Sequence, residues 1–329
     1  MTFSVSPGSF EGLAKEWQGL VDVSGQRKVF LTPLWQRTWW QEFSQGRKLA
    51  LFSIHNDTRL IGIAPLMWED KSLALIGSQD VCDFRDFVVL PGAEATFYKE
   101  LLGKLETKEW RSLELPSLPH SSPTLVYFVP LAQSQGYQVD VAQEDVSPLL
   151  ELPASWEEYL AALRKKDRHE LRRKMRRLTQ QADYRCYVAS DSHRLIRDMA
   201  DFLYLCRLSR PEKDEFLTEA REAFLRVLAH SLMEGGYLKL FFMEVDGARV
   251  AAAFCLDDGE ELALYNSGYD PAYSWLSVGL LLKSYCIEQA VAWGRKRFNF
   301  LRGAEAYKYH LGGRDLPIYH CTVSRGDGG

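Results

Sequence analysis

The sequence predicts a mixed α/β (α+β) fold in two halves, and three observations support this. The 329 residues are 46% hydrophobic, which is enough for more than one core because single cores usually stop growing at ~250–300 residues. Apolar residues recur with helical and with strand periodicity in both halves of the chain. The two halves also share a hairpin pattern when one is shifted by 190 positions.

The first half, residues 1–150, begins with two helices, near residues 10–20 and 33–44. Its periodicity then predicts strands at Leu49–His55, Arg59–Trp68, Ser72–Ile76 and Arg85–Leu90, a helix over Glu94–Leu105, a strand at Arg111–Leu115, a helix over Thr124–Gln135 and a strand at Gln138–Val141. Ser155 followed by Glu158 is typical of a capping box that opens a new helix, so we place the domain boundary near residue 150.

The second half, residues 151–329, repeats this plan. We expect helices at 156–180, 192–209 and 218–235, strands at Tyr237–Val245, Ala248–Asp257 and Glu261–Tyr269, an apolar helix at about 276–293, and strands near Phe298–Phe300 and Pro317–Val323. The shift of 190 positions aligns residues 51–60 with 241–250, and both segments carry an Asn-Asp or Asp-Gly turn. Generic hairpins would also align in this way, so the repeat alone is only suggestive.

Composition bears on several functional classes. Lys and Arg number 40 against 44 Asp and Glu, so the net charge of −4 gives no general attraction to nucleic acid. The six cysteines are isolated and lack zinc-ligand spacing, so we expect reduced core thiols and no metal. No signal-peptide pattern and no apolar run of ~18 residues occurs, and we expect a cytoplasmic protein without a transmembrane segment. Peripheral membrane contact stays open.

A polar turn between a strand and a helix marks the final third. Such a turn presents free backbone N–H groups and the positive end of the helix, where a phosphate can bind. Ser277, Val278 and Gly279 lie there and are the candidate donor-binding residues, and Gly279 would let a ligand approach the backbone closely. Taken alone, this pattern fits an ordinary strand–helix unit with a Ser cap at least as well.

Three motifs follow one another in this region: Tyr265-Asn-Ser-Gly-Tyr-Asp270, Gly279-Leu-Leu281 and a closing Phe-Leu-Arg-Gly-Ala-Glu-Ala-Tyr-Lys that ends at Lys308. In this order they resemble the FemAB-like and CelD-type (cellulose-biosynthesis-associated) acyltransferases of the GNAT superfamily. The likeness runs from about Leu152 to the end, and the first half resembles the family only in strand layout. The turn before Gly279 lacks the Gln/Arg-x-x-Gly-x-Gly/Ala signature of the usual CoA loop, which leaves aminoacyl-tRNA as an alternative donor.

The resemblance implies tandem GNAT (acyl-CoA N-acyltransferase-like) domains with mixed, mostly antiparallel sheets. It further implies acyl-CoA, for example acetyl-CoA, as co-substrate on the second domain and a small-molecule amine acceptor in the cleft between the domains. The implied acceptor is an amino sugar or amino-acid derivative of envelope or exopolysaccharide biosynthesis.

The catalytic candidates come from the closing motif and the strand. We expect direct attack of the amine in a ternary complex, because no Cys or Ser lies in a nucleophile arrangement with a His. Lys308 would stabilise the developing oxyanion or bind an acceptor anion. Tyr307 or Tyr265 would protonate a departing thiolate, and Asp270 or Glu305 would receive the amine proton. For these tyrosines and acids, a half-buried ring and a turn cap are the competing interpretations.

The candidates for acceptor binding are Arg302, Asp83, Arg85 and Asp86. Arg302 is permanently charged and can bind an anion with two hydrogen bonds. The others lie in the polar loop 77–87, which faces the inter-domain cleft in the resembling family, and Asp86 is a further candidate for the amine proton. A mutually paired, solvated loop is about as plausible.

One strongly basic segment stands out. Residues 164–177 read RKKDRHELRRKMRR, with nine basic and two acidic residues, which leaves 31 basic against 42 acidic residues elsewhere. The resemblance implies that this segment lies near the donor and acceptor phosphates, with Arg168, Arg172 and Arg173 as the expected contacts. A tRNA donor would need a larger basic surface with stacking aromatics, so we expect no stable nucleic-acid complex. Anionic lipid headgroups and a solvated helix face are the other interpretations.

The leading functional interpretation is therefore an N-acyltransferase acting on an amine. An aminoacyl-tRNA-dependent transferase of peptidoglycan bridges is an alternative, although the chain lacks the coiled-coil arm expected in many such enzymes. A non-catalytic GNAT-derived scaffold is the second alternative, because function inferred from fold is only analogy.

Overall fold

The computed structural model describes residues 2–25 and 28–325, and the chain divides into two compact units. Unit 1 comprises residues 1–145 and 316–329, and unit 2 comprises residues 146–315. The division falls a few residues before the boundary expected near 150. The last strand belongs to unit 1 and not to the second half, because Cys321 and Val323 pack in the hydrophobic core of unit 1.

The sheet of unit 1 has the strand order β1-β2-β3-β4-β6-β13-β7. The first four strands pair antiparallel, and β6 pairs parallel with β4. The strands are β1 (Phe3–Pro7), β2 (Lys48–Asn56), β3 (Arg59–Glu69), β4 (Ser72–Leu75), β5 (Val88–Val89, beside β3), β6 (Ser112–Pro119), β7 (Gln138–Glu151) and β13 (Arg314–Ser324).

The helices of unit 1 largely follow the predicted pattern. Ser9 caps α1 and Thr32 caps α2 by accepting backbone N–H groups, as their side chains favour. The helices are α1 (Phe10–Val23), η1 (Val29–Leu31), α2 (Pro33–Phe43), α3 (Glu94–Glu106), the π-turn η2 (Thr124–Phe128) and α4 (Val129–Ser134). The strand expected at 85–90 is reduced to two residues that pair with β3, because Arg85 bonds to Gly77 and to Ser117 of β6, and Asp86 bonds to Thr124 of η2.

Unit 2 repeats the strand plan of unit 1. Four antiparallel strands, β8 (Tyr184–Ala189), β9 (Leu238–Val245), β10 (Ala248–Asp257) and β11 (Glu261–Tyr269), precede a parallel fifth, β12 (Arg297–Asn299). The end of β7 pairs antiparallel with β12. The hairpins β2–β3 and β9–β10 thus take the second and third places of their sheets, in agreement with the shift of 190 positions.

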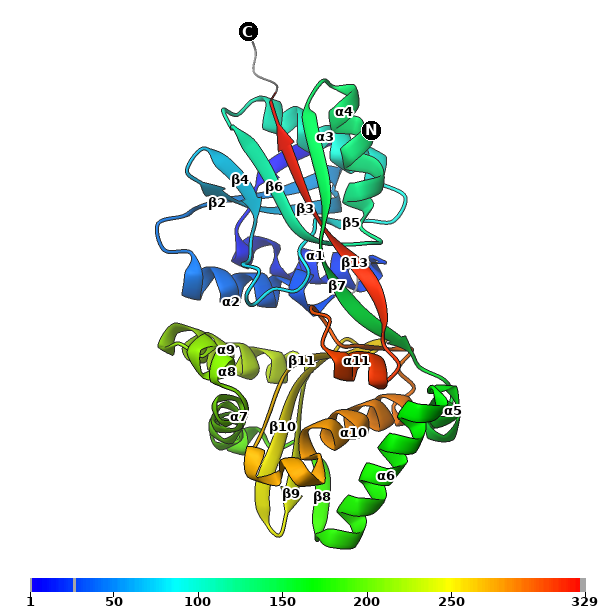
Figure 1. Cartoon of the computed structure of the whole chain (residues 1–329). Coiled ribbons are helices and arrows are strands. Elements are labelled where there is room, and N and C mark those ends of the chain that lie inside the picture. Colours follow the sequence, from blue (N-terminus) through cyan, green and yellow to red (C-terminus); the bar gives the residue numbers. More distant parts are fainter. Residues whose placement is uncertain (1, 26–27, 326–329) are drawn as a thin grey trace. The chain divides into compact units, whose positions relative to one another are not determined.

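Helices cover both faces of the unit 2 sheet (Figure 1). α6 and α10 pack with Phe241 and Ala251 in one core, whereas Phe202 of α7 lies on Phe254 of the opposite face. The helices are α5 (Trp156–Ala162), α6 (Lys165–Gln181), η3 (Ser192–Arg194), α7 (Leu195–Ser209), α8 (Pro211–Phe216), α9 (Glu219–Glu234), η4 (Pro271–Leu276), α10 (Val278–Ala292) and α11 (Ala306–His310).

The single helix expected at 156–180 is two helices. Leu163 and Arg164 have extended backbones between α5 and α6, and Leu163 packs in the unit 2 core. Arg168 donates hydrogen bonds to the carbonyls of Ala161 and Leu163, which replaces the helical bonds lost at the break.

All six cysteines carry free thiols, as expected, and five of them are buried. No helix in residues 2–25 and 28–325 is long and apolar enough to cross a bilayer.

Candidate functional site

Strand β11 separates from its parallel neighbour after three residues. It pairs with β12 only over Glu261–Ala263 and keeps β10 on its other side to Tyr269. A bulge at Tyr265 shifts the register with β10, in which Leu264 lies opposite Cys255 and Asn266 opposite Phe254. Within the described chain, no strand pairs with the other edge of residues 264–269. Such an edge can hydrogen-bond an extended ligand, and bulges are frequent beside active sites.

Two cations converge where β11 leads into α10. Ser277 precedes α10 with a left-handed backbone (φ 62°), and its Oγ lies 3.2 Å from Lys174 Nζ and 3.0 Å from Arg177 Nη2. The backbone N–H groups of Val278 and Gly279 have no hydrogen-bond partner among the described residues. Positive side chains and free N–H groups at a helix start together form a site suited to an anion.

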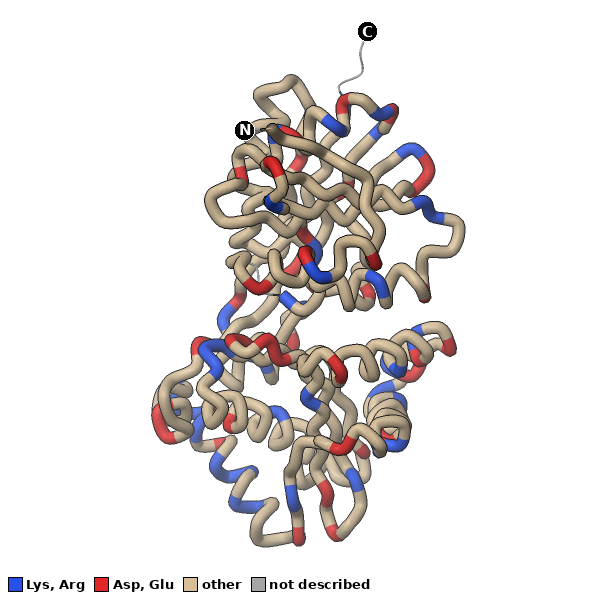
Figure 2. Tube along the Cα trace, turned by 180° about the vertical axis from the view of Figure 1, so that it is seen from behind, with Lys and Arg blue, Asp and Glu red and all other residues tan. Residues whose placement is uncertain are grey.

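The cations at Ser277 come from the basic helix α6 (Figure 2). They are not the predicted Arg168 and Arg172: Arg168 holds the end of α5, and Arg172 is exposed without a partner in the described chain. Arg173 forms an ion pair with Glu170. Arg177 Nε is buried and unbonded among the described atoms, so this guanidinium keeps hydrogen-bonding capacity for a ligand.

The glycines of the two motifs have packing roles. A Cβ at Gly268 would lie 2.3 Å from the backbone nitrogen of Cys206, so the glycine lets α7 lie directly on β11. A Cβ at Gly279 would lie 2.9 Å from the ring of Tyr269. The space expected for a ligand beside Gly279 Cα is therefore filled by Tyr269, and the glycine permits close packing of α10 on β11.

The buried Lys283 and the half-buried Lys213 lie near the open part of β11. Lys283 of α10 donates to the carbonyl of Gly279 (3.2 Å) and faces the ring of Tyr307 at 4.9 Å. Burial, reinforced by the charge of Lys213, lowers the pKa of Lys283 to about 8. Lys213 of α8 donates to Asn266 Oδ1 (2.8 Å) and to the carbonyl of Ser267, and burial lowers its pKa as well.

We call Lys213, Lys283 and Tyr307 the lysine cluster. No carboxylate in the described chain forms an ion pair with either lysine, so both are held without a counter-ion. The pKa of Tyr307 is raised by burial, which keeps its hydroxyl protonated at neutral pH. The cluster thus combines a lysine that can lose its proton with a phenol that retains one.

Sequence reasoning missed both lysines. Lys283 stands inside the apolar run of α10, between Leu282 and Cys286, and a helix that is apolar all round is buried. That pattern could have identified a buried lysine. Lys213 gives no such signal, because it lies on a six-residue helix that periodicity does not detect.

Lys308 builds the turn that follows β12. Its buried ammonium donates to the carbonyls of Leu301 (2.9 Å), Arg302 (2.6 Å) and Gly303 (3.0 Å) and pairs with Glu305 at 2.9 Å. Leu301 has φ 59°, an unfavourable conformation for a branched residue that surrounding contacts must hold. Because these acceptors occupy all three ammonium protons, the structure gives Lys308 the position of a support for this turn.

The other candidates of unit 2 lie in β11, directly after it, and on the turn that follows β12. The ring of Tyr265 packs against Phe254 with centroids 5.6 Å apart. Asp270 caps η4 by accepting a hydrogen bond from the N–H of Ala272. Arg302 is half-buried on the turn held by Lys308.

The candidates of unit 1 are part of its internal structure. Arg85 is buried and donates to the carbonyl of Gly77 and to Ser117 Oγ. Asp86 is buried and accepts hydrogen bonds from the Phe87 N–H and the Thr124 hydroxyl. Asp83 is half-buried beside them. The first two side chains hold the loop 77–87 in place.

Comparison with known families agrees with the geometry of unit 2. Residues 165–309, from α6 to α11, match the model of an acetyltransferase (GNAT) domain. The match covers most of unit 2, which thus resembles a GNAT acetyltransferase domain. A search of the curated proteins found no match.

Solved structures show the same tandem GNAT fold over nearly the whole chain. FemX is similar with a TM-score of 0.69 at 11% identity, over 97% of this chain and 96% of FemX. The C-terminal domain of a putative lysylphosphatidylglycerol synthetase from Agrobacterium fabrum follows at 0.59 and 10% identity, over 97% and 93%. A tandem GNAT protein from the clavulanic acid biosynthesis pathway gives 0.51 at 13% identity, over 99% and 100%. Identities this low establish the fold alone.

The match of residues 165–309 to an acetyltransferase (GNAT) domain implies an acyl donor and an acceptor. The geometry adds where each could act. The anion site at Ser277 lies at one end of the open strand edge, and the lysine cluster lies along it.

Proposed function

We propose that the protein transfers an acyl group from an acyl-CoA-type thioester to an amine. The observation that carries the proposal is the convergence of Lys174 and Arg177 on Ser277 at the start of α10. Both cations meet a neutral hydroxyl there, beside two free backbone N–H groups. Lys174 also pairs with Glu170 at 3.2 Å, whereas Arg177 has no carboxylate partner among the described residues, so the corner keeps positive charge that a pyrophosphate would neutralise.

The donor would extend from this corner along β11. Its amide-bearing arm would hydrogen-bond the open edge of residues 264–269. Trp275, 53% exposed and two residues before Ser277, offers a face for a nucleotide base. With a helical rise of about 1.5 Å per residue, Lys283 lies about 9 Å along α10 from Ser277. The acyl end of the donor would then approach the lysine cluster.

The lysine cluster would supply the proton transfers. With a pKa of about 8, Lys283 is neutral in a sizeable fraction near pH 7.5 and can accept the proton that the attacking amine loses. Tyr307 remains protonated and can give its proton to the departing thiolate. The amide bond forms as the thioester bond breaks. The free thiol leaves with the proton of Tyr307, and the proton taken up by Lys283 then returns to the phenolate.

A covalent acyl-enzyme is not part of this proposal. Cys206, the cysteine that interacts electrostatically with both lysines, is buried, and burial raises its pKa to about 12. A thiol with that pKa is a poor nucleophile at neutral pH. We accordingly propose direct attack, with Lys308 positioning the turn 301–303 and Arg302 binding an anionic part of the acceptor.

Aminoacyl-tRNA is the second candidate donor. The outward face of α6 carries exposed cations that no described residue pairs with, such as Lys165, Lys166 and Arg172. These could follow a phosphate backbone, whereas a CoA donor uses only the inward cations Lys174 and Arg177.

Thermal unfolding with acetyl-CoA tests the donor. Saturating ligand, about 100 times its Kd, stabilises a protein by about 2.7 kcal/mol. We expect this stabilisation for the native chain and for the exposed control Arg176→Gln, and at least a tenfold weaker Kd for Lys174→Gln/Arg177→Gln. An equal response in all three proteins would place the donor elsewhere. No response in any of them would favour aminoacyl-tRNA, which filter binding then tests.

A further inference from the structure

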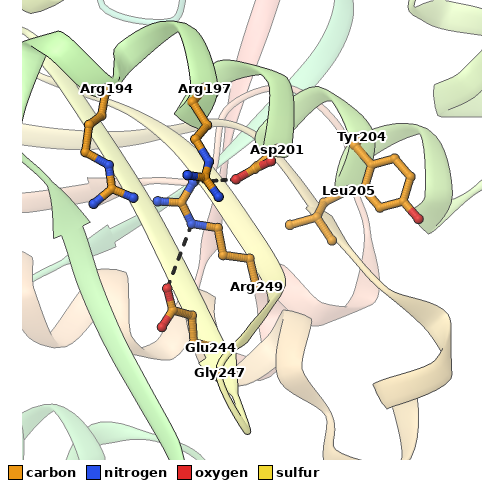
Figure 3. A pocket seen from close by; sticks show the side chains of 8 residues that line it. All are labelled: Arg194, Arg197, Asp201, Tyr204, Leu205, Glu244, Gly247 and Arg249. Carbon is orange, nitrogen blue, oxygen red and sulfur yellow. Dashed lines mark hydrogen bonds and ion pairs between the residues drawn. The ribbon is translucent and has the colours of Figure 1, made fainter.

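A hollow lies on the opposite face of the unit 2 sheet from α10. Its volume is about 300 Å³, within the range of small-molecule sites. Glu244 lines it, and side chains alternate along a strand, so Glu244 points away from the core face that carries Met243 and Val245. The lining residues are Arg194, Arg197, Asp201, Tyr204, Leu205, Glu244, Gly247 and Arg249 (Figure 3).

The floor of this hollow is fixed by Arg249. Its guanidinium pairs with Asp198 and with Asp201, each at 2.7 Å, and lies 3.9 Å from the ring centroid of Phe242. Its Nε also donates to the Tyr187 hydroxyl at 2.9 Å. A guanidinium bound on several sides keeps one geometry, so the floor is pre-organised.

The rim carries two further arginines, which are exposed and unpaired in the described chain, unlike Arg249. Arg194 and Arg197 come from the first turn of α7 and its cap, both are exposed, and neither has a partner in the described chain. Figure 3 shows both side chains reaching from α7 towards the hollow. The nearby carboxylates already have partners, since Asp201 binds Arg249 and Glu244 binds Arg185.

The charges around the hollow do not balance. Arg185, Arg194, Arg197 and Arg249 face the three carboxylates of Asp198, Asp201 and Glu244, which leaves a positive surplus. The surplus lies at the rim, where the start of α7 adds its positive helix end. Two guanidinium groups one helical turn apart can share the oxygens of one phosphate or carboxylate.

Apolar surface completes the hollow. Tyr204 is 63% exposed, and Leu205 lines the wall between it and the sheet. A ring and an aliphatic side chain can cover the body of a ligand while the arginines hold its anionic group.

We propose that this hollow binds a small organic anion, whose phosphate or carboxylate is held by Arg194 and Arg197. The site is separate from the donor corner at Ser277, which lies on the α10 side of the sheet. It does not depend on the proposed reaction. The backbone of Leu205 and Cys206 also lies against Gly268 of β11, so an occupant would adjoin the helix that packs on the reaction strand.

Isothermal titration of the full chain with inorganic phosphate and with citrate, at constant ionic strength, tests the proposal. Both probes carry the shared chemistry, and the tighter one identifies phosphate or carboxylate as the preferred group. We expect saturable binding that weakens at least tenfold in Arg194→Gln/Arg197→Gln and is unchanged in Arg226→Gln, an exposed control on α9.

The donor corner must be separated in the same experiment, since phosphate would bind there too. In the Lys174→Gln/Arg177→Gln background, the Arg194/Arg197-dependent binding should persist. In the Arg194→Gln/Arg197→Gln variant, the acetyl-CoA response should match the native chain. The proposal is overturned if the double variant Arg194→Gln/Arg197→Gln binds the probes as tightly as the native chain, or if neither probe binds saturably. This holds whatever the outcome for acetyl-CoA.

Discussion

Replacing Lys283 by methionine should make the protein more stable and less active. Methionine nearly matches the volume of the lysine side chain, so the core around α10 stays filled. The lysine is buried and its Nζ has a single hydrogen-bond acceptor, the carbonyl of Gly279. The substitution thus removes a charge that the fold holds without an ionic partner, at the cost of one hydrogen bond.

The magnitude follows from the pKa of Lys283. It falls from 10.5 to about 8 on folding, and each pH unit is worth about 1.4 kcal/mol, so holding this amine in the folded state costs about 3 kcal/mol at pH 7. Because the pKa is lowered, the full cost applies below pH 8 and disappears as the pH rises to 10.5. We expect Lys283→Met to gain 2 to 3 kcal/mol at pH 7, and ever less from pH 8 to 10.5.

Urea unfolding at pH 7, 8, 9 and 10 measures this gain. Lys165→Met, at an exposed position on α6, is the control and should differ little from the native chain at any pH. If Lys283 accepts the amine proton, kcat/KM of the native enzyme also rises with pH towards a plateau above about 8, and the variant loses this limb. The reasoning would be refuted if Lys283→Met were less stable than the native chain at pH 7, or if its gain in stability did not change with pH.

The remaining predictions concern the strand and the two turns. Gly268→Ala should cost about 3 kcal/mol or more in urea unfolding, because its Cβ would meet the backbone of α7, which cannot move aside as a side chain can; Gly19→Ala, with open space around it, should cost nothing. Lys308→Met should lose about 3 kcal/mol, because three turn carbonyls lose their donor and Glu305 its partner. If the Lys308→Met variant kept its full activity, Lys308 would not position the turn 301–303 for the reaction. Ser277→Gly should relieve up to about 1 kcal/mol of backbone strain and weaken acetyl-CoA binding, and unchanged binding would count against the donor corner.

The long elements could be predicted from sequence because burial imposes a period on them. The hairpins β2–β3 and β9–β10 have a buried majority and turns at Asp57 and Asp246, whose positive φ values suit Asp. The elements that were missed lack this signal: β8 is largely exposed at its start, and α8 and α11 have only six and five residues. The break at Leu163 depends on a tertiary bond from Arg168, which no local pattern carries.

The turn at Ser277 could be predicted from the sequence, but the cations that meet it could not, and its role as a donor site stays a prediction. The turn at Ser277 was expected from the strand–helix pattern, and the structure places two cations of the basic helix there. Which cations they are depends on how α6 rotates against α10. A sequence stripe of nine basic residues does not determine this rotation, because its apolar positions allow several. Lys174 and Arg177 were therefore passed over in favour of Arg168 and Arg172.

Three cations of unit 2, the buried Lys283 and Lys308 and the half-buried Arg249, differ in their bonding partners and therefore in the role that each can have. Arg249 is surrounded by carboxylates, and Lys308 by three carbonyls and a carboxylate, so each holds its neighbours in place. Lys283 has one carbonyl and the face of Tyr307. A buried cation without an anionic partner destabilises a fold, whereas a fully hydrogen-bonded and paired cation can leave the stability unchanged. Lys283 lowers the stability of the fold and holds no neighbouring turn in place. Its presence in an apolar helix beside the open strand is therefore best explained by a use for its proton. The pH dependence of Lys283→Met tests that explanation directly.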